Sequence, residues 1–214
     1  MDPSFPDRRL ASPRRLRRRA LAVIAAWLCL SGACAAGPVH YSGSGSVIGV
    51  VDGDTVDVLL SAEQAMAIDL PRRKSPIAVR MRLDQVDTPE RGQPWANRAK
   101  QALSEQVFDR TVRFDIHDID RYGRAVVDLY IGDMWINAWL VEQGHGWAYR
   151  RYLRQPALLC RLEDDARAAG RGLWSQPAAT WIPPPLWRRK DTRAAPSVIS
   201  RSECLAAATA DAKH

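Results

Sequence analysis

Short apolar segments of strand length, separated by turn residues, constrain the fold of residues 47–131 more than any other feature of the sequence. In residues 79–83, apolar and charged side chains alternate, which indicates a half-buried β-strand. Residues 47–51 and 56–60 are rich in apolar side chains and flank an Asp-Gly turn, an arrangement that predicts a β-hairpin. Two further strands are expected over residues 111–116 and 124–131.

Three helices are expected among and after these strands. Apolar residues recur at helical spacing in residues 94–108, 136–143 and 156–169. The last helix begins at Pro156 and is followed by Gly170, which are common start and stop residues. Five short strands grouped early, with three helices, predict an α+β fold: a five-stranded OB-fold-like antiparallel β-barrel with three packed α-helices.

The net charge of +7 is concentrated in the first 35 residues of the 214-residue chain, which hold seven arginines and two acids. The rest of the chain has 24 basic and 22 acidic residues. Binding to nucleic acid depends on where charges cluster, so this weakly basic remainder does not by itself indicate such a partner. The length suits one domain with additional segments.

Residues 1–35 have the pattern of a secretory signal peptide. An arginine-rich segment precedes a short apolar segment, too short to span a bilayer, and small residues follow. Ala33-Cys34-Ala35 fits cleavage after Ala35, so we expect a secreted or periplasmic protein with a flexible spacer at 36–46 and no stable membrane association. The alternative is a lipid anchor at Cys34, because Ser31-Gly32-Ala33-Cys34 resembles a lipobox with serine where leucine is usual.

Cleavage after Ala35 leaves two cysteines, Cys160 and Cys204. An even pair in an oxidising compartment favours a disulfide bond between them. Cys160 is expected on the polar side of helix 156–169, from which it could reach a C-terminal segment. Two free thiols are the alternative, because sequence alone does little to determine pairing.

Three segments lack the periodicity of strands and helices. Residues 61–76 contain two prolines and a basic cluster and are expected to form a long loop. Residues 177–190 are rich in Pro and Trp and predict an extended segment on the domain surface. Residues 191–214 are expected to form a flexible tail unless Cys204 fixes them. The folded domain is accordingly expected over residues 47–176.

Four acidic residues lie in turns at the ends of the expected strands: Asp52, Asp54, Asp87 and Glu90. Acidic residues are common in turns, because their side chains bond to the local backbone. Two such turns side by side could also supply the oxygen ligands that calcium prefers, and a cation held there would neutralise phosphate and position an attacking water. Arginines in matching positions favour this second interpretation, since their planar fork binds phosphate oxygens.

Three motifs occur in a fixed order along the chain. They are Asp52-Gly53-Asp54-Thr55, then Arg82-Leu83 with Val86-Asp87-Thr88-Pro89-Glu90, then Asp120 with Tyr122-Gly123-Arg124. This succession resembles the staphylococcal nuclease family, and the similarity covers about residues 47–174. Each motif alone is weak evidence for this family, whereas the three motifs in this order, with both arginines present, are specific evidence for it.

The resemblance implies a calcium site and a general base. Asp54 and Asp87 match the family's calcium-binding carboxylates, and the Thr88 backbone carbonyl matches a further ligand. Glu90 matches the glutamate that orients or deprotonates the attacking water. Calcium is therefore the expected cofactor.

The resemblance also implies two groups that bind phosphate and two that contact the nucleotide. Arg82, five residues before Asp87, matches the first phosphate-binding arginine. Arg124 matches the second, which stabilises charge in the pentavalent transition state. Tyr122 and Tyr149 match aromatic residues that line the nucleotide pocket, where stacking tolerates any base. Tyr149 could equally cap the barrel.

The expected function is calcium-dependent hydrolysis of DNA and RNA phosphodiesters by a monomer, with a preference for single strands and with 3′-phosphate products. The alternative is a non-catalytic nucleic-acid-binding module on the same fold. Such modules typically lose the acids or the arginines of the site. Here the three acids and two arginines are all present, which favours the enzyme.

Two loops depart from the family pattern. The segment before Arg82 is longer, and its Arg72-Arg73-Lys74 cluster matches no family role. A solvated loop tip is expected there, and contact with a polynucleotide backbone is the alternative. The loop Arg91-Gly92-Gln93-Pro94 is shorter, which bears on how firmly Glu90 is held.

Overall fold

The computed structural model describes residues 41–68, 77–190 and 200–211. The expected signal peptide, Cys34 and the Arg72-Arg73-Lys74 cluster lie outside the described residues. Within those three ranges, no helix is both long enough and apolar enough to cross a membrane.

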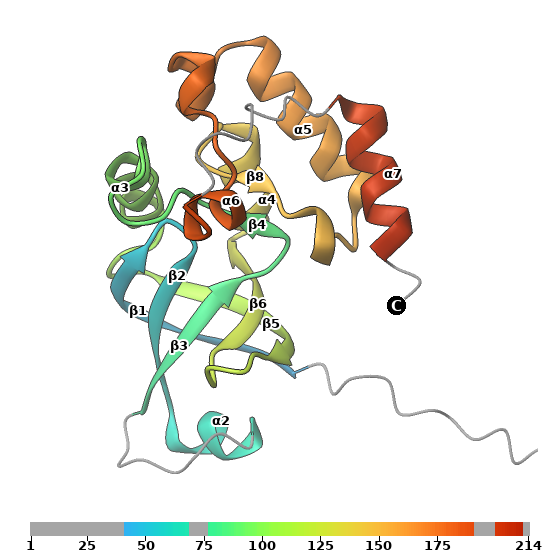
Figure 1. Ribbon diagram of the computed structural model, residues 1–214. Helices are drawn as coiled ribbons and strands as arrows, with labels where there is room; N and C mark the ends of the chain where they lie inside the picture. The colour runs from blue at the N-terminus through green and yellow to red at the C-terminus, as the bar shows by residue number, and fades with distance from the viewer. Residues whose placement is uncertain (1–40, 69–76, 191–199, 212–214) are drawn as a thin grey trace, which may run out of the picture. The chain divides into compact units, whose positions relative to one another are not determined.

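Five strands form a closed β-barrel (Figure 1). They are β1 (Tyr41–Asp52), β2 (Thr55–Leu60), β3 (Ile77–Leu83), β5 (Thr111–Ile119) and β6 (Ala125–Ile131). Antiparallel pairs join them in the order β3-β2-β1-β5-β6, and β6 pairs with β3 in parallel to close the barrel. The short strand β7 (Met134–Trp135) continues the sheet beyond β6.

The predicted α+β barrel is confirmed, with one difference in strand direction. Val58, Met81, Phe114 and Leu129 are fully buried, as alternating strands with one apolar face require. The closing pair is parallel because strand directions cannot alternate all the way around a barrel with an odd number of strands. The barrel is therefore mixed rather than entirely antiparallel.

Of the three predicted helices, two pack on the barrel and the third packs on one of these two. They are α3 (Ala96–Val107), α4 (Ile136–Glu142) and α5 (Pro156–Ala168). α3 packs against β1, and α4 contacts both β6 and α5 (Figure 1). Two further short strands, β4 (Val86–Asp87) and β8 (Trp147–Ala148), pair antiparallel, and α4 contacts β4 while α5 contacts β8.

Two segments expected to be irregular are regular. β1 begins at Tyr41, so residues 41–46 of the expected spacer form a strand that pairs with β5. Part of the expected loop 61–76 forms helix α2 (Ala62–Ala67), at the opposite end of the barrel from α6 (Figure 1). This helix begins at a capping box, in which Ser61 and Gln64 each bond to the other's backbone N–H.

The C-terminal segments are also more ordered than expected. Residues 177–190 contain the short helix α6 (Pro184–Arg188), and the expected tail contains α7 (Arg201–Asp211). Short 3-10 helices are η2 (Arg150–Tyr152), η3 (Gly172–Ser175) and η4 (Ala178–Thr180). α7 packs against α5, and a disulfide between Cys160 and Cys204 joins the two helices. Cys160 is buried rather than on an open polar face, because α7 covers it.

Candidate active site

The β1–β2 turn holds Asp54 in a buried position. Asp52 Oδ1 accepts a hydrogen bond from the Asp54 N–H (3.2 Å), and Asp54 Oδ1 accepts one from the Thr55 hydroxyl (3.0 Å). Gly53 lets the turn approach its neighbour closely, since a Cβ there would lie 2.7 Å from Thr88 Oγ1. The Thr88 N–H in turn donates to Asp54 Oδ2 at 3.2 Å. The first carboxylate is thereby tied to the segment that carries the second.

The turn between β3 and β4 positions Asp87. Gln85 has a left-handed backbone conformation (φ 63°), and its N–H donates to Asp84 Oδ1. The buried amide of Asn137, on α4, donates to the carbonyls of Asp84 and Val127 and so fixes the turn. β4 then pairs with β8, which sets the position of Asp87. Neither Gln85 nor Asn137 belongs to a motif that would have indicated this role from sequence.

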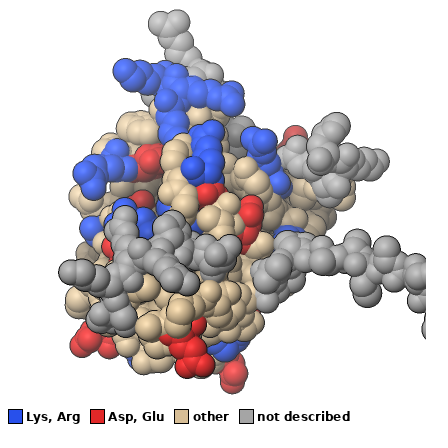
Figure 2. Space-filling view, turned by 90° about the horizontal axis from the view of Figure 1, so that it is seen from below, with Lys and Arg blue, Asp and Glu red and all other residues tan. Residues whose placement is uncertain are grey.

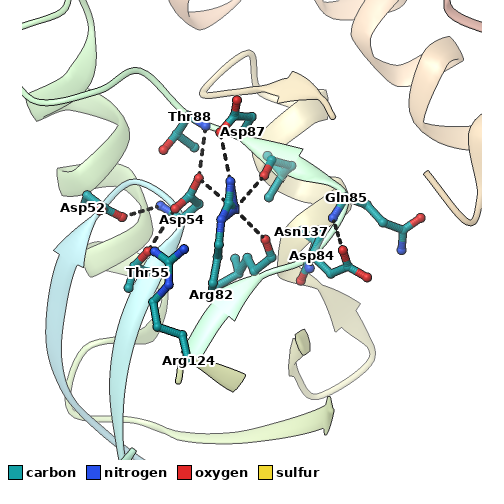
Figure 3. A network of polar contacts seen from close by, with 12 residues as sticks. Asp52, Asp54, Thr55, Arg82, Asp84, Gln85, Asp87, Thr88, Arg124 and Asn137 are labelled. Carbon is teal, nitrogen blue, oxygen red and sulfur yellow. Dashed lines mark hydrogen bonds and ion pairs between the residues drawn. The ribbon is translucent and has the colours of Figure 1, made fainter. Parts of the chain in front are cut away.

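Arg82, near the end of β3, lies between the two carboxylates (Figure 3). Its Nη2 donates to Asp87 Oδ1 at 2.9 Å, and its Nη1 lies 3.4 Å from Asp54 Oδ2. Nη1 also donates to the carbonyls of Leu83 and Val86. One guanidinium therefore connects the β1–β2 turn with the β3–β4 turn.

Burial and repulsion perturb the charges of this cluster. Burial, and then the charge of Asp54, raises the pKa of Asp87 to about 7, against the opposing effect of Arg82 and Arg188. Burial and then Asp54 also raise the pKa of Asp52 to about 6. For Arg82, burial disfavours the charged form, but Asp54 and Asp87 outweigh it and raise the pKa. The cluster thus concentrates negative charge, a condition under which a bound cation is favourable.

The β5–β6 hairpin brings Arg124 to the same cluster. Asp120 Oδ1 accepts hydrogen bonds from the backbone N–H groups of Tyr122 and Arg124, and Gly123 supplies the positive φ (75°) of the turn. Arg124 Nε donates to Asp120 Oδ2 at 2.7 Å, and its guanidinium lies 5.4 Å from the Tyr122 ring centre. In Figure 3 the Arg124 side chain is directed toward the β1–β2 turn.

Glu90 follows β4 at the start of the short loop. Its N–H donates to Gln93 Oε1 at 2.9 Å, and its Oε1 accepts a hydrogen bond from Arg188 Nη1 at 2.8 Å. Arg188 is the last residue of α6, and its Nη2 also lies 3.5 Å from Asp87 Oδ2. The Glu90 side chain is 37% exposed, so water can reach it.

A pocket of about 360 Å³ collects these groups. Its lining consists of Val51, Asp52, Asp54, Arg82, Asp87, Thr88, Pro89, Glu90, Arg91, Tyr122, Arg124 and Arg188. It therefore contains every expected catalytic and metal-binding residue and one of the two tyrosines. Tyr149 lies outside this lining, with its ring centre 5.6 Å from the Arg82 guanidinium carbon and 4.9 Å from that of Tyr152. Arg188 was not expected, because it is 98 positions from Glu90 in the sequence.

The donor groups of the pocket suit a hard cation. Calcium binds carboxylate oxygens, backbone carbonyls and water, and Asp54 and Asp87 supply two adjacent carboxylates. In the described part of the chain, no three His, Cys, Asp or Glu side chains are grouped to hold a metal by themselves. A cation would consequently depend on two carboxylates, a backbone carbonyl and water.

The raised pKa of Asp87 predicts how the metal-free protein responds to pH. A pKa raised from 3.8 to about 7 contributes stability that is complete below pH 3.8 and is lost as pH rises through about 7. Asp87→Asn abolishes this ionisation, so the free energy of unfolding of the variant should rise relative to that of the wild type between about pH 4 and pH 7. Urea unfolding in the presence of chelator measures the gain.

The matched control is Asp165→Asn, at an exposed ion pair of α5, which should show no comparable pH-dependent gain. A difference between Asp87→Asn and wild type that stays constant with pH would contradict the prediction.

Comparisons with known proteins agree with the geometry. A family model described as "Staphylococcal nuclease homologue" matches residues 80–176. Protein ParB of Escherichia coli is 37% identical over 191 residues, which cover 82% of this chain and 96% of that protein. Micrococcal nuclease of Shigella flexneri is 34% identical over 160 residues, or 70% and 83% of the two chains.

An uncharacterized endonuclease of Escherichia coli O157:H7 is 34% identical over 147 residues, which cover 68% of this chain and 85% of that protein. The barrel, the paired carboxylates and the two arginines are thus accompanied by similarity over most of the length of several relatives. The chain belongs to the staphylococcal nuclease family.

Proposed function

We propose that the protein is a calcium-dependent nuclease that hydrolyses phosphodiester bonds of DNA and RNA. Family membership and relatives named as nucleases support a hydrolase acting on nucleic acid. The observation that carries the proposal is the convergence of two carboxylates, two arginines and a partly exposed glutamate in one pocket.

The two arginines would hold the scissile phosphate. Arg82 lies on β3 and Arg124 in the turn before β6, and both line the pocket. A guanidinium donates two parallel hydrogen bonds to phosphate oxygens and remains charged at any physiological pH. Donors aimed at the oxygens that gain charge in the transition state stabilise it more than the ground state. Arg124, whose side chain is more exposed than that of Arg82, is the better placed of the two to reach a substrate.

Glu90 would accept a proton from the attacking water. The water oxygen then forms a bond to phosphorus as the bond from phosphorus to the 5′-oxygen breaks. The released 5′-oxygen takes a proton from solvent, and the phosphate stays on the 3′ side. Asp54, Asp87 and the Thr88 carbonyl would hold calcium, which when bound neutralises phosphate charge and positions the water.

A preference for single strands is supported by the exposed Tyr122 beside Arg124. The Tyr122 residue is 67% exposed, and an aromatic ring next to a phosphate-binding group can stack on any unpaired base. On the face drawn in Figure 2, most Lys and Arg lie in the upper half, with some acidic residues among them and others along the lower edge. A basic area of this kind attracts the nucleic-acid backbone without regard to sequence.

Removal of calcium should abolish cleavage of denatured DNA, and Arg124→Ala should lower kcat by about 100- to 1000-fold, because one transition-state donor is lost. Arg110→Ala, an exposed arginine that bonds to the Gln106 carbonyl, is the control and should retain activity. Cleavage that survives chelator would reject the dependence on calcium, whereas binding of nucleic acid without any cleavage would instead support the non-catalytic module.

The proposed strand preference and product chemistry can be tested on oligonucleotides. Single-stranded DNA and RNA should be cleaved faster than the corresponding duplex, since the pocket stacks unpaired bases. Mass spectrometry of the fragments should find phosphate on the 3′ end and a free 5′-hydroxyl. Fragments with 5′-phosphate would reject the proposed direction of attack.

We propose that the protein acts outside the cytoplasm, because residues 1–35 have the pattern of a signal peptide. We also propose that it acts as a monomer. The intact mass of the exported protein should correspond to a chain that begins at Ala36. A mass that corresponds to an acylated Cys34 at the N-terminus would instead indicate a lipid anchor.

A further inference from the structure

The segment 177–190, here named the C-terminal strap, reaches the active-site pocket although the family model ends at residue 176. Trp181 fixes the strap near its start, because its Nε1 donates to the Gln176 carbonyl and its ring packs edge-on against Trp174 at 5.3 Å. Ile182 and Pro184 are buried, and α6 begins immediately after Pro183. The strap is therefore packed in place and does not depend on its polar contacts alone.

The strap contacts Glu90 on two sides. On the backbone side, Gln93 Oε1 accepts the Glu90 N–H while Gln93 Nε2 donates to the Ile182 carbonyl. Gln93 is only 4% exposed, so this amide forms a buried bridge between the short loop and the strap. On the side-chain side, Arg188 Nη1 donates to Glu90 Oε1 at 2.8 Å.

We propose that Arg188 is a positioning residue that holds the Glu90 carboxylate in the orientation needed to receive a proton from water. The inference rests on the proposed nuclease function. The bond to Oε1 restricts the rotation of the carboxylate and leaves its other oxygen for water. The rate of proton transfer falls steeply when a general base is misplaced. A carboxylate held in one orientation therefore supports a higher rate than a mobile one.

The geometry favours Glu90 over the phosphate as the target of Arg188. The contact with Glu90 is a hydrogen bond of 2.8 Å, whereas the approach to Asp87 is 3.5 Å. The short loop places Glu90 within reach of the strap, and Gln93 fixes the distance between the two backbones. Arg82 and Arg124 already supply two guanidinium groups for phosphate oxygens.

Steady-state kinetics on denatured DNA with calcium tests the proposal, with Arg188→Ala, Arg188→Lys and the adjacent Arg189→Ala as control. Arg188→Ala should lower kcat by about 10- to 100-fold with little change in KM, because positioning rather than binding is lost. Arg188→Lys should recover part of kcat, since lysine keeps one charged donor. Arg189 is exposed and is not among the described residues that line the pocket, so its variant should behave as wild type.

A double-mutant cycle with Glu90→Gln identifies the group through which Arg188 acts. In the Glu90→Gln background, Arg188→Ala should cause no further loss of kcat. An equal loss in both backgrounds, or a rise in KM with unchanged kcat, would overturn the proposal and indicate direct contact with phosphate. Unchanged or faster turnover of Arg188→Ala would overturn it as well.

Thermal unfolding of each variant separates these outcomes from loss of the fold. Arg188 is half-exposed, so its variants should melt within a few degrees of wild type. A folded wild type that cleaves no nucleic acid would reject the proposed function and the inference with it. An active wild type with an equally active Arg188→Ala variant would reject the inference alone.

Discussion

The geometry of the pocket depends on one guanidinium, that of Arg82, which two buried carboxylates share. Charged groups are unfavourable away from water unless they are paired and hydrogen-bonded. The protein meets this requirement for Arg82 with Asp54, Asp87 and two backbone carbonyls. The same contacts do not fully offset the burial of Asp87, because burial and the charge of Asp54 raise its pKa to about 7 despite the opposing effect of Arg82 and Arg188. The free protein therefore keeps an unfavourable concentration of negative charge, as sites that bind cations often do.

The parallel closure of the barrel places the two phosphate-binding arginines together. β3 and β6 pair with a stagger, in which Met81 lies opposite Ala125 and Arg82 opposite Val126. The end of β3 consequently lies beside the start of β6, where Arg124 precedes the strand. Two side chains that are 42 positions apart in the sequence reach the same pocket because the barrel has an odd number of strands and must contain one parallel pair.

The barrel and the residues of the pocket could be predicted because their signals are local. Apolar alternation indicated the strands, and the acidic residues in strand-end turns became a predicted site through the order of three short motifs that resembles the staphylococcal nuclease family. Helices α2 and α7 also had local signals that were not recognised. Ser61 with Gln64, and Ser200 with Glu203, are pairs three residues apart that bond reciprocally at the start of a helix. The buried roles of Gln85 and Asn137 had no such signal, because they depend on distant backbone groups.

The contacts that hold Glu90 come partly from residues beyond the segment that the family model matches. The sequence indicated that the loop after Glu90 is short. The length of this loop does not show which groups hold Glu90 in place. In the fold, Gln93 uses both ends of its amide, one on Glu90 and one on Ile182 of the strap. A shorter loop would bring the base closer to the body of the domain, where a segment beyond residue 176 can reach it. The strap has no strand or helix periodicity that would have indicated this role. Its contribution depends on a contact between two residues that are 98 positions apart in the sequence.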